Sequence, residues 1–295
     1  AVDWEAEVWV NGQRVGRHQG GYLPFTFDIT PYLRSGEQEL IVVVWDPTDT
    51  HWQQRGKQVR RPHSIWYTQI SGIWQTVWLE AVPSRYIAGL RITPDLATQA
   101  VRVKVLAGGS DVLRDIHVEV WAEGTRLVEG SLSSSEDELV MSLPSPRLWH
   151  PDSPFLYDLV VAAEGDRVRS YFGLREFGLG KDGHGRTRVL LNGEPLFMFG
   201  PLDQGYWPES LLTPPSDEAI RRDIRLTKEM GFNGVRKHQK LEDPRYLYWA
   251  DRLGLLVSSE AANAYLFDDR YVARFTSEWA ASVVRDRNHP SVVMW

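Results

Sequence analysis

The sequence closes on Asn288-His289-Pro290-Ser291-Val292-Val293-Met294-Trp295, whose second half is an apolar run with the composition of a buried β-strand. No turn residue, helix cap or polar tail follows this run. We therefore expect the last domain to be incomplete within these 295 residues. Sheets whose strands alternate with helices carry their chemistry just beyond the strand C-termini, so part of the site is expected to lie outside the sequence.

The segment before this ending alternates patterns typical of strands and of helices. A strand is expected over residues 196–200, and a Pro-rich loop follows it. A helix is predicted to start near Ser216, because Asp217 and Glu218 suit the positive end of a helix, and to stop at Gly231. This first unit has the order strand, loop, helix.

Two further units of the same kind follow. Residues 234–236 are the next predicted strand, Asp243 and Pro244 begin a helix that ends at Gly254, and residues 255–257 are the third strand. A third helix precedes the final strand, and its inward face is expected to carry Phe275, Trp279 and Val283. Four strands and three helices with short connections predict parallel units that make up the first half of a (β/α)8 barrel.

The first two thirds of the sequence have an all-β pattern. Residues 1–83 predict a β-sandwich that lacks its first strands, in which Asn11-Gly12 forms a hairpin turn and residues 40–45 form a strand buried on both faces. Residues 84–183 predict an immunoglobulin-like sandwich. Its expected strands include residues 101–105, 117–121 and 157–162. The barrel part is expected over residues 184–295.

Composition excludes several classes of function. A net charge of -6 and a pI near 5.8 argue against binding to nucleic acid or to an anionic membrane surface, since both need clustered cations. The one basic cluster, residues 55–61, is expected to be a solvated loop. No apolar run approaches the roughly 20 residues of a membrane span. The count of 13 Trp suits stacking on sugar rings, although filling sandwich cores explains most Trp residues equally well.

The absence of cysteine rules out disulfides and thiolate chemistry within this sequence. It fits a reducing compartment and so favours a cytoplasmic protein. No signal peptide is visible at the start. Because the sequence opens inside a strand-like segment, a leader among earlier residues stays open.

Short strings along the sequence carry a family resemblance. They are Val8-Trp9-Val10-Asn11-Gly12, Ser71-Gly72-Ile73-Trp74, Leu148-Trp149-His150-Pro151, Leu191-Asn192-Gly193, Gly231-Phe232-Asn233-Gly234-Val235-Arg236 and the closing octapeptide. In this order they resemble the family 2 glycoside hydrolases, which include β-galactosidases, β-glucuronidases and β-mannosidases. The resemblance implies a jelly-roll sugar-binding domain, an immunoglobulin-like domain and a (β/α)8 catalytic domain.

The resemblance also implies where the catalytic groups lie. In the family the acid/base Glu follows an Asn shortly after the Trp that matches Trp295, and the nucleophilic Glu lies much further on. Retaining hydrolysis needs both carboxyl groups, about 5 to 5.5 Å apart. We therefore expect no catalytic residue within this sequence, and we predict that a chain limited to it does not hydrolyse glycosides.

The residues that support the site are expected to remain. Arg236 matches a family Arg whose donors hold the nucleophile ionised, and a surface ion pair is its alternative role. By strand alternation His238 points the same way, either as a ligand of sugar hydroxyls or as a satisfied loop histidine. Glu260 matches an acidic family position and is expected to line the site rather than to act as the acid. Trp295 is expected either to form the bottom of the sugar pocket or only to pack against neighbouring side chains.

The loop after the first barrel strand carries further candidates for hydroxyl recognition and ring stacking, namely Asp203, Gln204, Tyr206 and Trp207. Here the sequence departs from the Asn-Arg-His-Glu string of familiar β-galactosidases, so the sugar is left open. Residues 261–265 lack the Glu and His that complete a magnesium site in some relatives. The eight histidines show no paired ligand spacing, and no metal or other cofactor is expected.

In the leading interpretation, this sequence is part of a retaining β-glycosidase that acts on a carbohydrate substrate. We expect neither nucleic acid nor a membrane as a partner. The alternative is a noncatalytic carbohydrate-binding or scaffold module, and a more remote one is a carbohydrate transferase. A homo-oligomer of the full-length protein is left open. Because the last strand has a free edge, the isolated chain is expected to associate or to be loosely ordered in its last third.

Overall fold

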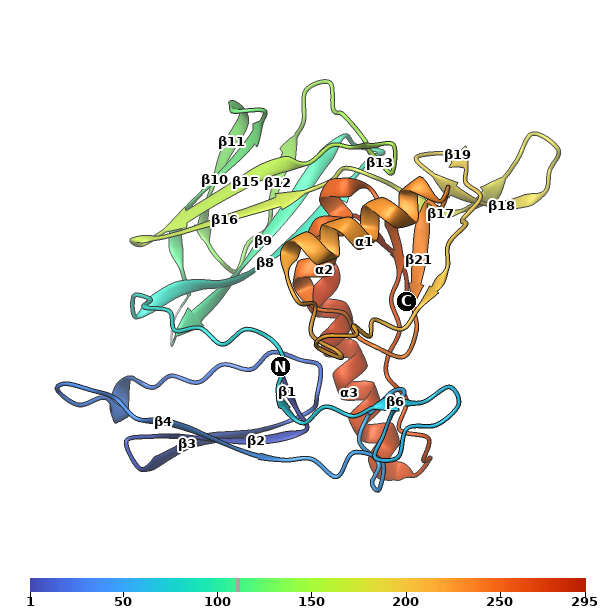
Figure 1. Ribbon diagram of the computed structural model, residues 1–295. Helices are drawn as coiled ribbons and strands as arrows, with labels where there is room; N and C mark the ends of the chain where they lie inside the picture. Colours follow the sequence, from blue (N-terminus) through green and yellow to red (C-terminus); the bar gives the residue numbers. More distant parts are fainter. Residues whose placement is uncertain (110–111) are drawn as a thin grey trace.

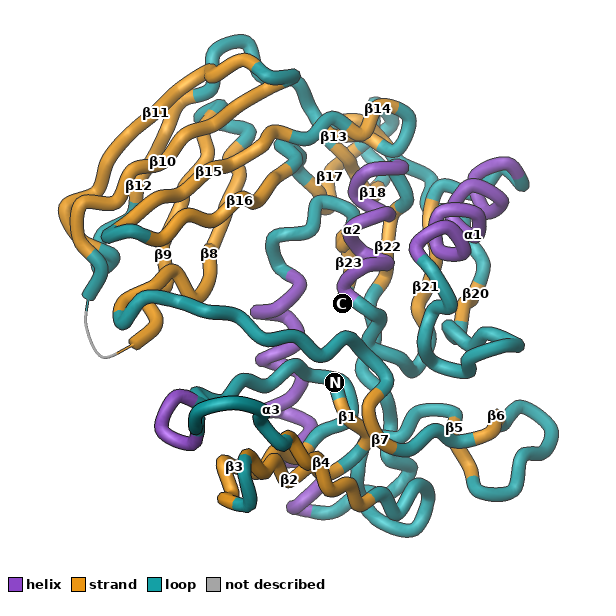
Figure 2. Tube along the Cα trace, turned by 60° about the vertical axis from the view of Figure 1, so that its left-hand side comes forward, coloured by secondary structure: helices purple, strands orange, loops and turns teal. Residues whose placement is uncertain are grey.

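A computed structural model describes residues 1–109 and 112–295, and the chain forms three parts (Figures 1 and 2). The first strands lie at the bottom of Figure 1, a β-sandwich lies at upper left, and the helices with their parallel strands lie at right. The long helix α3 runs from the parallel strands down to the N-terminal part. Among the described residues, no helix has both the length and the apolar character needed to cross a membrane.

The N-terminal part is built on a three-stranded antiparallel sheet with the order β3-β2-β4. Its strands are β2 (Glu5–Val10), β3 (Gln13–Gln19) and β4 (Leu40–Trp45). The predicted hairpin at Asn11 and Gly12 is confirmed, because both residues have positive φ, 52° and 78°, as a tight turn between twisted strands requires. Shorter elements complete this part: β1 (Val2–Asp3) with β7 (Gly72–Ile73), β5 (Gln58–Val59) with β6 (Tyr67–Thr68), and the 3-10 turn Thr30–Tyr32.

The prediction that residues 40–45 are buried on both faces is wrong. Leu40 is 56% exposed, and Val43 and Trp45 are each 51% exposed. The strand β4 pairs only with β2 among the described residues, so it forms an edge of the sheet. An apolar run indicates that a strand can be buried, but a second layer must cover it before it is buried.

The second part is the expected two-layered sandwich. One sheet has the order β11-β10-β15-β16 and the other the order β12-β9-β8. Their strands are β8 (Arg85–Asp95), β9 (Ala100–Gly109), β10 (Arg114–Ala122), β11 (Thr125–Ser134), β12 (Leu139–Ser142), β15 (Tyr157–Ala163) and β16 (Asp166–Phe172). Side chains that alternate along these strands, such as Val103, Val118 and Leu159, are fully buried between the sheets.

Two small antiparallel groups connect the sandwich to the barrel strands. They are β13 (Trp149–His150) with β14 (Ser153–Pro154), and β17 (Phe177–Lys181) with β18 (Thr187–Leu191) and β19 (Glu194–Pro195). The predicted boundary between residues 183 and 184 falls in the turn of the β17–β18 hairpin. The domain boundaries at 83/84 and 183/184 stay predictions.

The third part contains the expected parallel strands, in the order β20-β21-β22-β23. They are β20 (Leu202–Asp203), β21 (Gly234–Lys237), β22 (Leu256–Ser258) and β23 (Val292–Met294), and between them lie α1 (Asp217–Glu229), α2 (Pro244–Leu253) and α3 (Asp269–Asp286). The predicted N-cap at Asp243 and the predicted helix start near Ser216 are confirmed, since Asp243 accepts from the Arg245 amide and Ser216 from the Ala219 amide. Gly254 ends α2 in the left-handed conformation.

The predicted strand over residues 196–200 is wrong in position. Asn233 interrupts the ladder there, because its side chain donates to the Phe197 carbonyl oxygen and accepts from the Phe199 amide. Parallel pairing with β21 begins only at Leu202. The side-chain amide of Asn233 thus replaces part of the backbone ladder, and no apolar pattern reveals such a substitution.

The helix α3 has a polar buried stripe, which differs from the predicted apolar one. Glu278, Ser282 and Asp286 are the buried residues of α3, whereas Phe275, Trp279 and Val283 are partly buried. The polar stripe meets the N-terminal part, where Arg274 donates to the Gln19 carbonyl oxygen and pairs with Glu278. Both the barrel strands and the N-terminal part pack against this helix. The spacing of its apolar residues does not show which face of the helix each of them contacts.

The polar half of the closing octapeptide holds β23 against the sandwich. The Asn288 side chain donates to the Leu90 carbonyl oxygen and accepts from the Ile92 amide. The Arg175 guanidinium donates to the carbonyl oxygens of Pro290 and Val292. This segment precedes β23, so it lies at the opposite end of the strand from the predicted site.

Asp3 gives a prediction about pH. Its carboxyl group is 4% exposed, accepts a hydrogen bond from Gln58 at 2.9 Å, and forms no ion pair within the described ranges. Burial raises the pKa of Asp3 to about 8. The folded chain then binds a proton that the unfolded chain releases near pH 3.8, so stability is present at low pH and falls with a slope of about 1.4 kcal/mol per pH unit toward pH 8.

We expect Asp3→Asn to remove this slope between pH 5 and 7, since the amide stays neutral. Chemical unfolding at a series of pH values measures the effect. Asp152→Asn is the matched control, because the Asp152 side chain is 87% exposed. An unchanged slope in Asp3→Asn would show that Asp3 is ionised in the folded chain.

Candidate functional site

Alternation along β21 and β22 places the predicted site residues on two different faces of the parallel sheet. Val235 and Val257 pack with residues of α1 and α2 in one apolar core, so their face is covered by the helices. The neighbours of these residues in the strands, Arg236 and Ser258, point to the opposite face, which is the interior of a (β/α)8 barrel. Arg236 is accordingly exposed, whereas Lys237 is buried on the helix side.

Three predicted residues meet on the interior face, and we call them the interior cluster: Arg236, His238 and Glu260. The Arg236 guanidinium pairs with Glu260 Oε1, and the His238 Nδ1 atom lies 2.8 Å from Glu260 Oε2. The Gln239 amide donates to the same Oε2 at 3.1 Å. Arg236 lies near the carboxyl end of β21, and His238 and Glu260 follow the carboxyl ends of β21 and β22, where barrel proteins hold their chemistry.

The environment of Glu260 defines what its carboxyl group can do. Burial acts to raise the pKa of Glu260, but hydrogen bonds from Arg236, His238 and the Gln239 amide hold it below its usual range. Glu260 is therefore ionised at neutral pH, so it holds donors in place and does not itself donate a proton. That Glu260 lines the site without acting as the acid stays a prediction.

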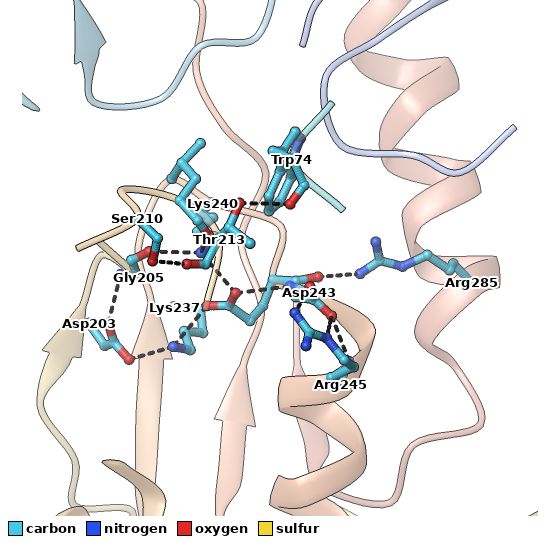
Figure 3. A network of polar contacts seen from close by, with 12 residues as sticks. Trp74, Asp203, Gly205, Ser210, Thr213, Lys237, Lys240, Asp243, Arg245 and Arg285 are labelled. Carbon is cyan, nitrogen blue, oxygen red and sulfur yellow. Dashed lines mark hydrogen bonds and ion pairs between the residues drawn. The ribbon is translucent and has the colours of Figure 1, made fainter. Parts of the chain in front are cut away.

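On the helix side, Asp203 belongs to a different network (Figure 3). Asp203 pairs with Lys237, and Lys237 Nζ lies 2.9 Å from Glu242 Oε2. Lys240 Nζ lies 2.9 Å from Glu242 Oε1 and donates to the carbonyl oxygens of Gly205 and Leu212 at 2.8 Å each. The network therefore ties the loop after β20 to the segment after β21.

The ionisable groups of this network shift the pKa values of one another. Burial acts to raise the pKa of Glu242, but Lys237 and Lys240 lower it to about 2. Burial acts to lower the pKa of Lys237, yet Asp203 and Glu242 raise it well above the usual value. Burial lowers the pKa of Lys240. Ionised Glu242 between two lysines is the electrostatic centre of the network.

The remaining candidates on the loop after β20 lie with Asp203 on the helix side of the parallel sheet. A polar cavity of about 360 Å³ is lined by Asp203, Gln204, Tyr206 and Trp207, together with Asp223 and Lys237. Gln204 Oε1 is buried there without a hydrogen-bond partner among the described residues. The structure thus brings Asp203, Gln204 and Trp207 together, but on the other side of the sheet from the interior cluster.

Trp295 meets the helix layer. Its ring lies edge to face with the Trp279 ring of α3, with centroids 5.8 Å apart and planes at 77°. Of the two alternatives for Trp295, this contact supports packing. The residue is exposed, however, and within the described chain no hydrogen bond or ring contact links it to the interior cluster.

Sequence reasoning missed a loop of the N-terminal part that reaches the barrel strands. Residues 54–68, which we call the sandwich loop, dock on the segments after β20, β21 and β22. The amides of Arg55 and Gly56 both donate to the Asn263 carbonyl oxygen, at 3.2 and 3.0 Å. Tyr67 stacks on Tyr206 with centroids 4.0 Å apart.

The expectation of a solvated basic loop over residues 55–61 is therefore wrong in its first half. Arg60 and Arg61 are exposed, but Arg55 is half-buried and Lys57 is 8% exposed. The glutamines at positions 53, 54 and 58, together with Trp66 and Tyr67, were the available sign, since a solvated tip seldom carries so many large side chains.

Side chains able to hold a metal gather in the described chain at His117, Glu119 and Glu129, on the second sandwich. The Arg126 guanidinium lies 3.2 Å from Glu119 and 2.8 Å from Glu129. These residues form an ion-pair network far from the parallel strands in sequence.

Two β-domains joined to parallel strands and helices, with an Arg, a His and a Glu at the strand ends, define a multidomain protein that includes part of a (β/α)8 barrel. Models of glycosyl hydrolases family 2 match in order: its sugar binding domain over residues 1–83, the family 2 model over residues 85–175, and its TIM barrel domain over residues 214–295. The chain belongs to glycoside hydrolase family 2.

Similar proteins extend beyond the length of this chain. A β-galactosidase from Thermoanaerobacter pseudethanolicus is 28% identical, and the match covers 98% of the chain but 40% of that protein. The β-galactosidase BoGH2A from Bacteroides ovatus is 30% identical over 100% of the chain and 36% of that protein. The crystal structure of a β-glycosidase from Bacteroides vulgatus superposes with a TM-score of 0.82 at 25% identity, covering 100% of the chain and 38% of that structure.

Proposed function

We propose that this chain forms part of a retaining β-glycosidase that hydrolyses O-glycosidic bonds of β-linked sugars. The observation that carries the proposal is the interior cluster at the carboxyl ends of parallel barrel strands. The order of the family 2 domains supports it, and so do relatives that are named β-galactosidases. The catalytic Glu pair is proposed to lie on polypeptide beyond Trp295.

The interior cluster fits a supporting role in that reaction. The Nε atom of Arg236 donates to the Glu260 carboxylate. The Nη2 atom of Arg236 lies 3.4 Å from His238 Nδ1. The side chain of Arg236 is 55% exposed, so it retains donors that face the barrel interior. We propose that these donors hold the nucleophilic carboxylate ionised and that His238 binds a sugar hydroxyl.

The helix-side candidates are proposed to act one step further from the sugar. Asp203, Gln204 and Trp207 belong to the loop that Lys240 ties down. In this proposal the loop forms a wall of the site, and its buried ion pairs hold that wall in one conformation. Glu260 likewise holds Arg236 and His238 rather than reacting itself.

A comparison of two proteins tests the proposed function. The 295-residue chain is expected to show no turnover of nitrophenyl β-glycosides, because retaining hydrolysis needs two carboxyl groups about 5 to 5.5 Å apart. The product of the same gene extended beyond Trp295 is expected to hydrolyse at least one of them with retention at the anomeric carbon. Arg236→Lys in that product should lower kcat by about 100-fold.

Turnover by the 295-residue chain would overturn the proposal that the catalytic pair lies elsewhere. Binding of sugars without any hydrolysis by the extended product would favour the noncatalytic carbohydrate-binding module instead. Arg225→Lys is a matched control, because Arg225 lies on the exposed side of α1 and, among the residues that the structure describes, pairs only with Glu218.

A further inference from the structure

A second cavity, of about 380 Å³, lies between the immunoglobulin-like sandwich and the C-terminal end of α3. On the sandwich side it is lined by residues 92–94 of β8 and by Gly173 and Arg175, which follow β16. On the other side it is lined by residues 283–284 of α3 and by residues 287–290, which precede β23. We call it the interdomain cavity. Its volume is in the range of pockets that hold small organic molecules.

The lining of the interdomain cavity is positively charged. Among the described residues that line it, Arg175 and Arg287 are cations and none has a carboxylate. Neither arginine forms an ion pair with a carboxylate in residues 1–109 and 112–295. The acidic residues next to the lining in sequence, Asp95 and Asp286, are each paired with another arginine, at 3.3 and 2.6 Å. The cavity therefore lacks a counterion for its two guanidinium groups.

Backbone carbonyl oxygens hold Arg175 in place without neutralising its charge. Its Nε atom donates to the Pro290 carbonyl oxygen at 3.1 Å, and its Nη2 atom donates to that of Val292 at 2.7 Å. No hydrogen bond from its Nη1 atom is found within the described ranges. Burial lowers the pKa of Arg175, although the Asp251 carboxylate, which is already paired with His289, acts to raise it. An anion in the cavity would offset the cost of burying this charge.

The rest of the lining is mostly apolar and is held by contacts between the two domains. Ile92 belongs to the buried core of the sandwich, whereas Val284 is 52% exposed on α3. A Cβ atom on Gly173 would lie 2.9 Å from the Pro290 Cβ atom, so any larger residue there would push the domains apart. The Asn288 side chain accepts from the Ile92 amide at 3.0 Å. Apolar surface and two guanidinium groups are thus fixed beside each other.

We propose that the interdomain cavity binds a small organic carboxylate with an apolar body. A guanidinium donates two parallel N–H groups to a carboxylate, and Arg175 and Arg287 supply these donors. The apolar body packs against Ile92 and Val284. This site is separate from the proposed glycosidase reaction, because it precedes β23, whereas the interior cluster lies at the carboxyl ends of β21 and β22. Its ligand touches both domains and so stabilises the contact between them.

Isothermal titration with the 295-residue chain tests the site, because every lining residue lies within it. The probes are benzoate, benzamide, which has the same ring without the charge, and acetate, which has the carboxylate without the ring. We expect benzoate to bind at least 10-fold more tightly than either of the others. Its advantage over benzamide should shrink as salt is added. Benzoate should also raise the melting temperature of the chain, since it binds the folded state.

Hydrogen exchange shows where benzoate binds. At saturating benzoate the Ile92 amide should exchange more slowly, because the ligand holds the contact between Ile92 and Asn288. The Gln239 amide, which donates to Glu260 in the interior cluster, should exchange at its former rate. The two amides therefore distinguish the interdomain cavity from the proposed sugar site.

Variants assign the binding to the cavity. Arg287→Gln removes a cation and Val284→Glu adds a negative charge, both at exposed positions where folding tolerates the change. Each should weaken benzoate binding at least 10-fold. Arg175→Lys keeps the charge but loses the planar fork, so it should weaken binding to a smaller extent. Arg222→Gln is the matched control, because Arg222 is exposed on α1 and does not line the cavity, and it should bind like the parent. Circular dichroism checks that each variant is folded.

The inference would be overturned if benzoate did not bind, or if it bound no more tightly than benzamide or acetate. Unchanged binding in both Arg287→Gln and Val284→Glu would also overturn it, and so would slower exchange at Gln239 without any change at Ile92. None of these measurements uses turnover of a glycoside. Their failure would leave the proposed function as it is, and failure of the glycosidase assay would leave the carboxylate site as it is.

Discussion

Replacing Asp251 by alanine is expected to lower the free energy of unfolding by about 3–5 kcal/mol. Asp251 is 0% exposed. Its Oδ2 accepts from the Tyr171 hydroxyl at 2.7 Å and lies 2.5 Å from His289 Nδ1, while its Oδ1 accepts from the Ser291 amide at 2.9 Å. Alanine would remove the acceptor of all three partners, of which Ser291 is fully buried and Tyr171 and His289 are partly buried.

The charge of His289 gives this prediction a second measurement. Burial acts to lower the pKa of His289, but the Asp251 carboxylate raises it above the ordinary 6.5. The stability from this pair is therefore fully present below pH 6.5 and is lost as pH rises through the folded-state pKa. In Asp251→Ala the pKa of His289, followed by NMR, should fall, because burial still acts to lower it and the carboxylate that raised it is gone.

Chemical unfolding compares the variants. Tyr171→Phe removes one of the three donors to Asp251 and should lower the free energy of unfolding by about 1 kcal/mol. Asp152→Ala is the control, because the Asp152 side chain is exposed, and it should change the free energy of unfolding by less than about 0.5 kcal/mol. A loss below about 1 kcal/mol in Asp251→Ala would mean that the contact between the sandwich and β23 does not depend on this carboxylate.

Replacing Glu242 by alanine is expected to have an effect of similar size, about 3–5 kcal/mol. Glu242 is 3% exposed and accepts from both Lys237 and Lys240. Its removal leaves Lys240 buried with carbonyl partners alone and Lys237 with Asp203 alone. Because the pKa of Glu242 is lowered to about 2, its contribution is present above pH 4.5 and is lost as pH falls toward 2.

A triple variant separates the charge effect from packing. Lys237→Met, Lys240→Met and Glu242→Leu together remove the buried charges, so the triple variant should be less destabilised than Glu242→Ala alone. Glu229→Ala, on the exposed end of α1, is the control and should be neutral. Hydrogen exchange should show faster exchange at Gly205 in Glu242→Ala, since Lys240, which donates to the Gly205 carbonyl oxygen, loses the carboxylate that holds it in place. A triple variant as unstable as Glu242→Ala would contradict this account.

Local sequence patterns predicted most of the regular structure. Asn11-Gly12, Ser216, Asp243 and Gly254 each act within a few residues, so their roles as turn and caps do not depend on the rest of the molecule. The misplaced strand over residues 196–200 fails for the opposite reason. Asn233, more than 30 residues away, takes hydrogen-bonding groups that a ladder would have used.

The candidate site was predicted in part. Strand alternation correctly joined Arg236 to His238, and the family resemblance added Glu260. Strand alternation also places Asp203 beside Lys237, on the helix side of the sheet. The sequence could not show this, because it does not reveal the register of β20 against β21. The sandwich loop was missed because the segments that it contacts lie far away in sequence, 139 residues for Tyr67 and Tyr206 and 208 for Gln54 and Ala262.

The sequence by itself determined the order of the domains, the parallel α/β units and the residues at the strand ends, because periodicity, caps and turns are set by neighbours along the chain. Only the tertiary structure decided which face of the sheet each side chain serves, which charges are paired, and that a loop of the first domain reaches the barrel. Those outcomes depend on contacts between segments far apart in sequence, where burial and electrostatics select one arrangement among many that the local pattern allows.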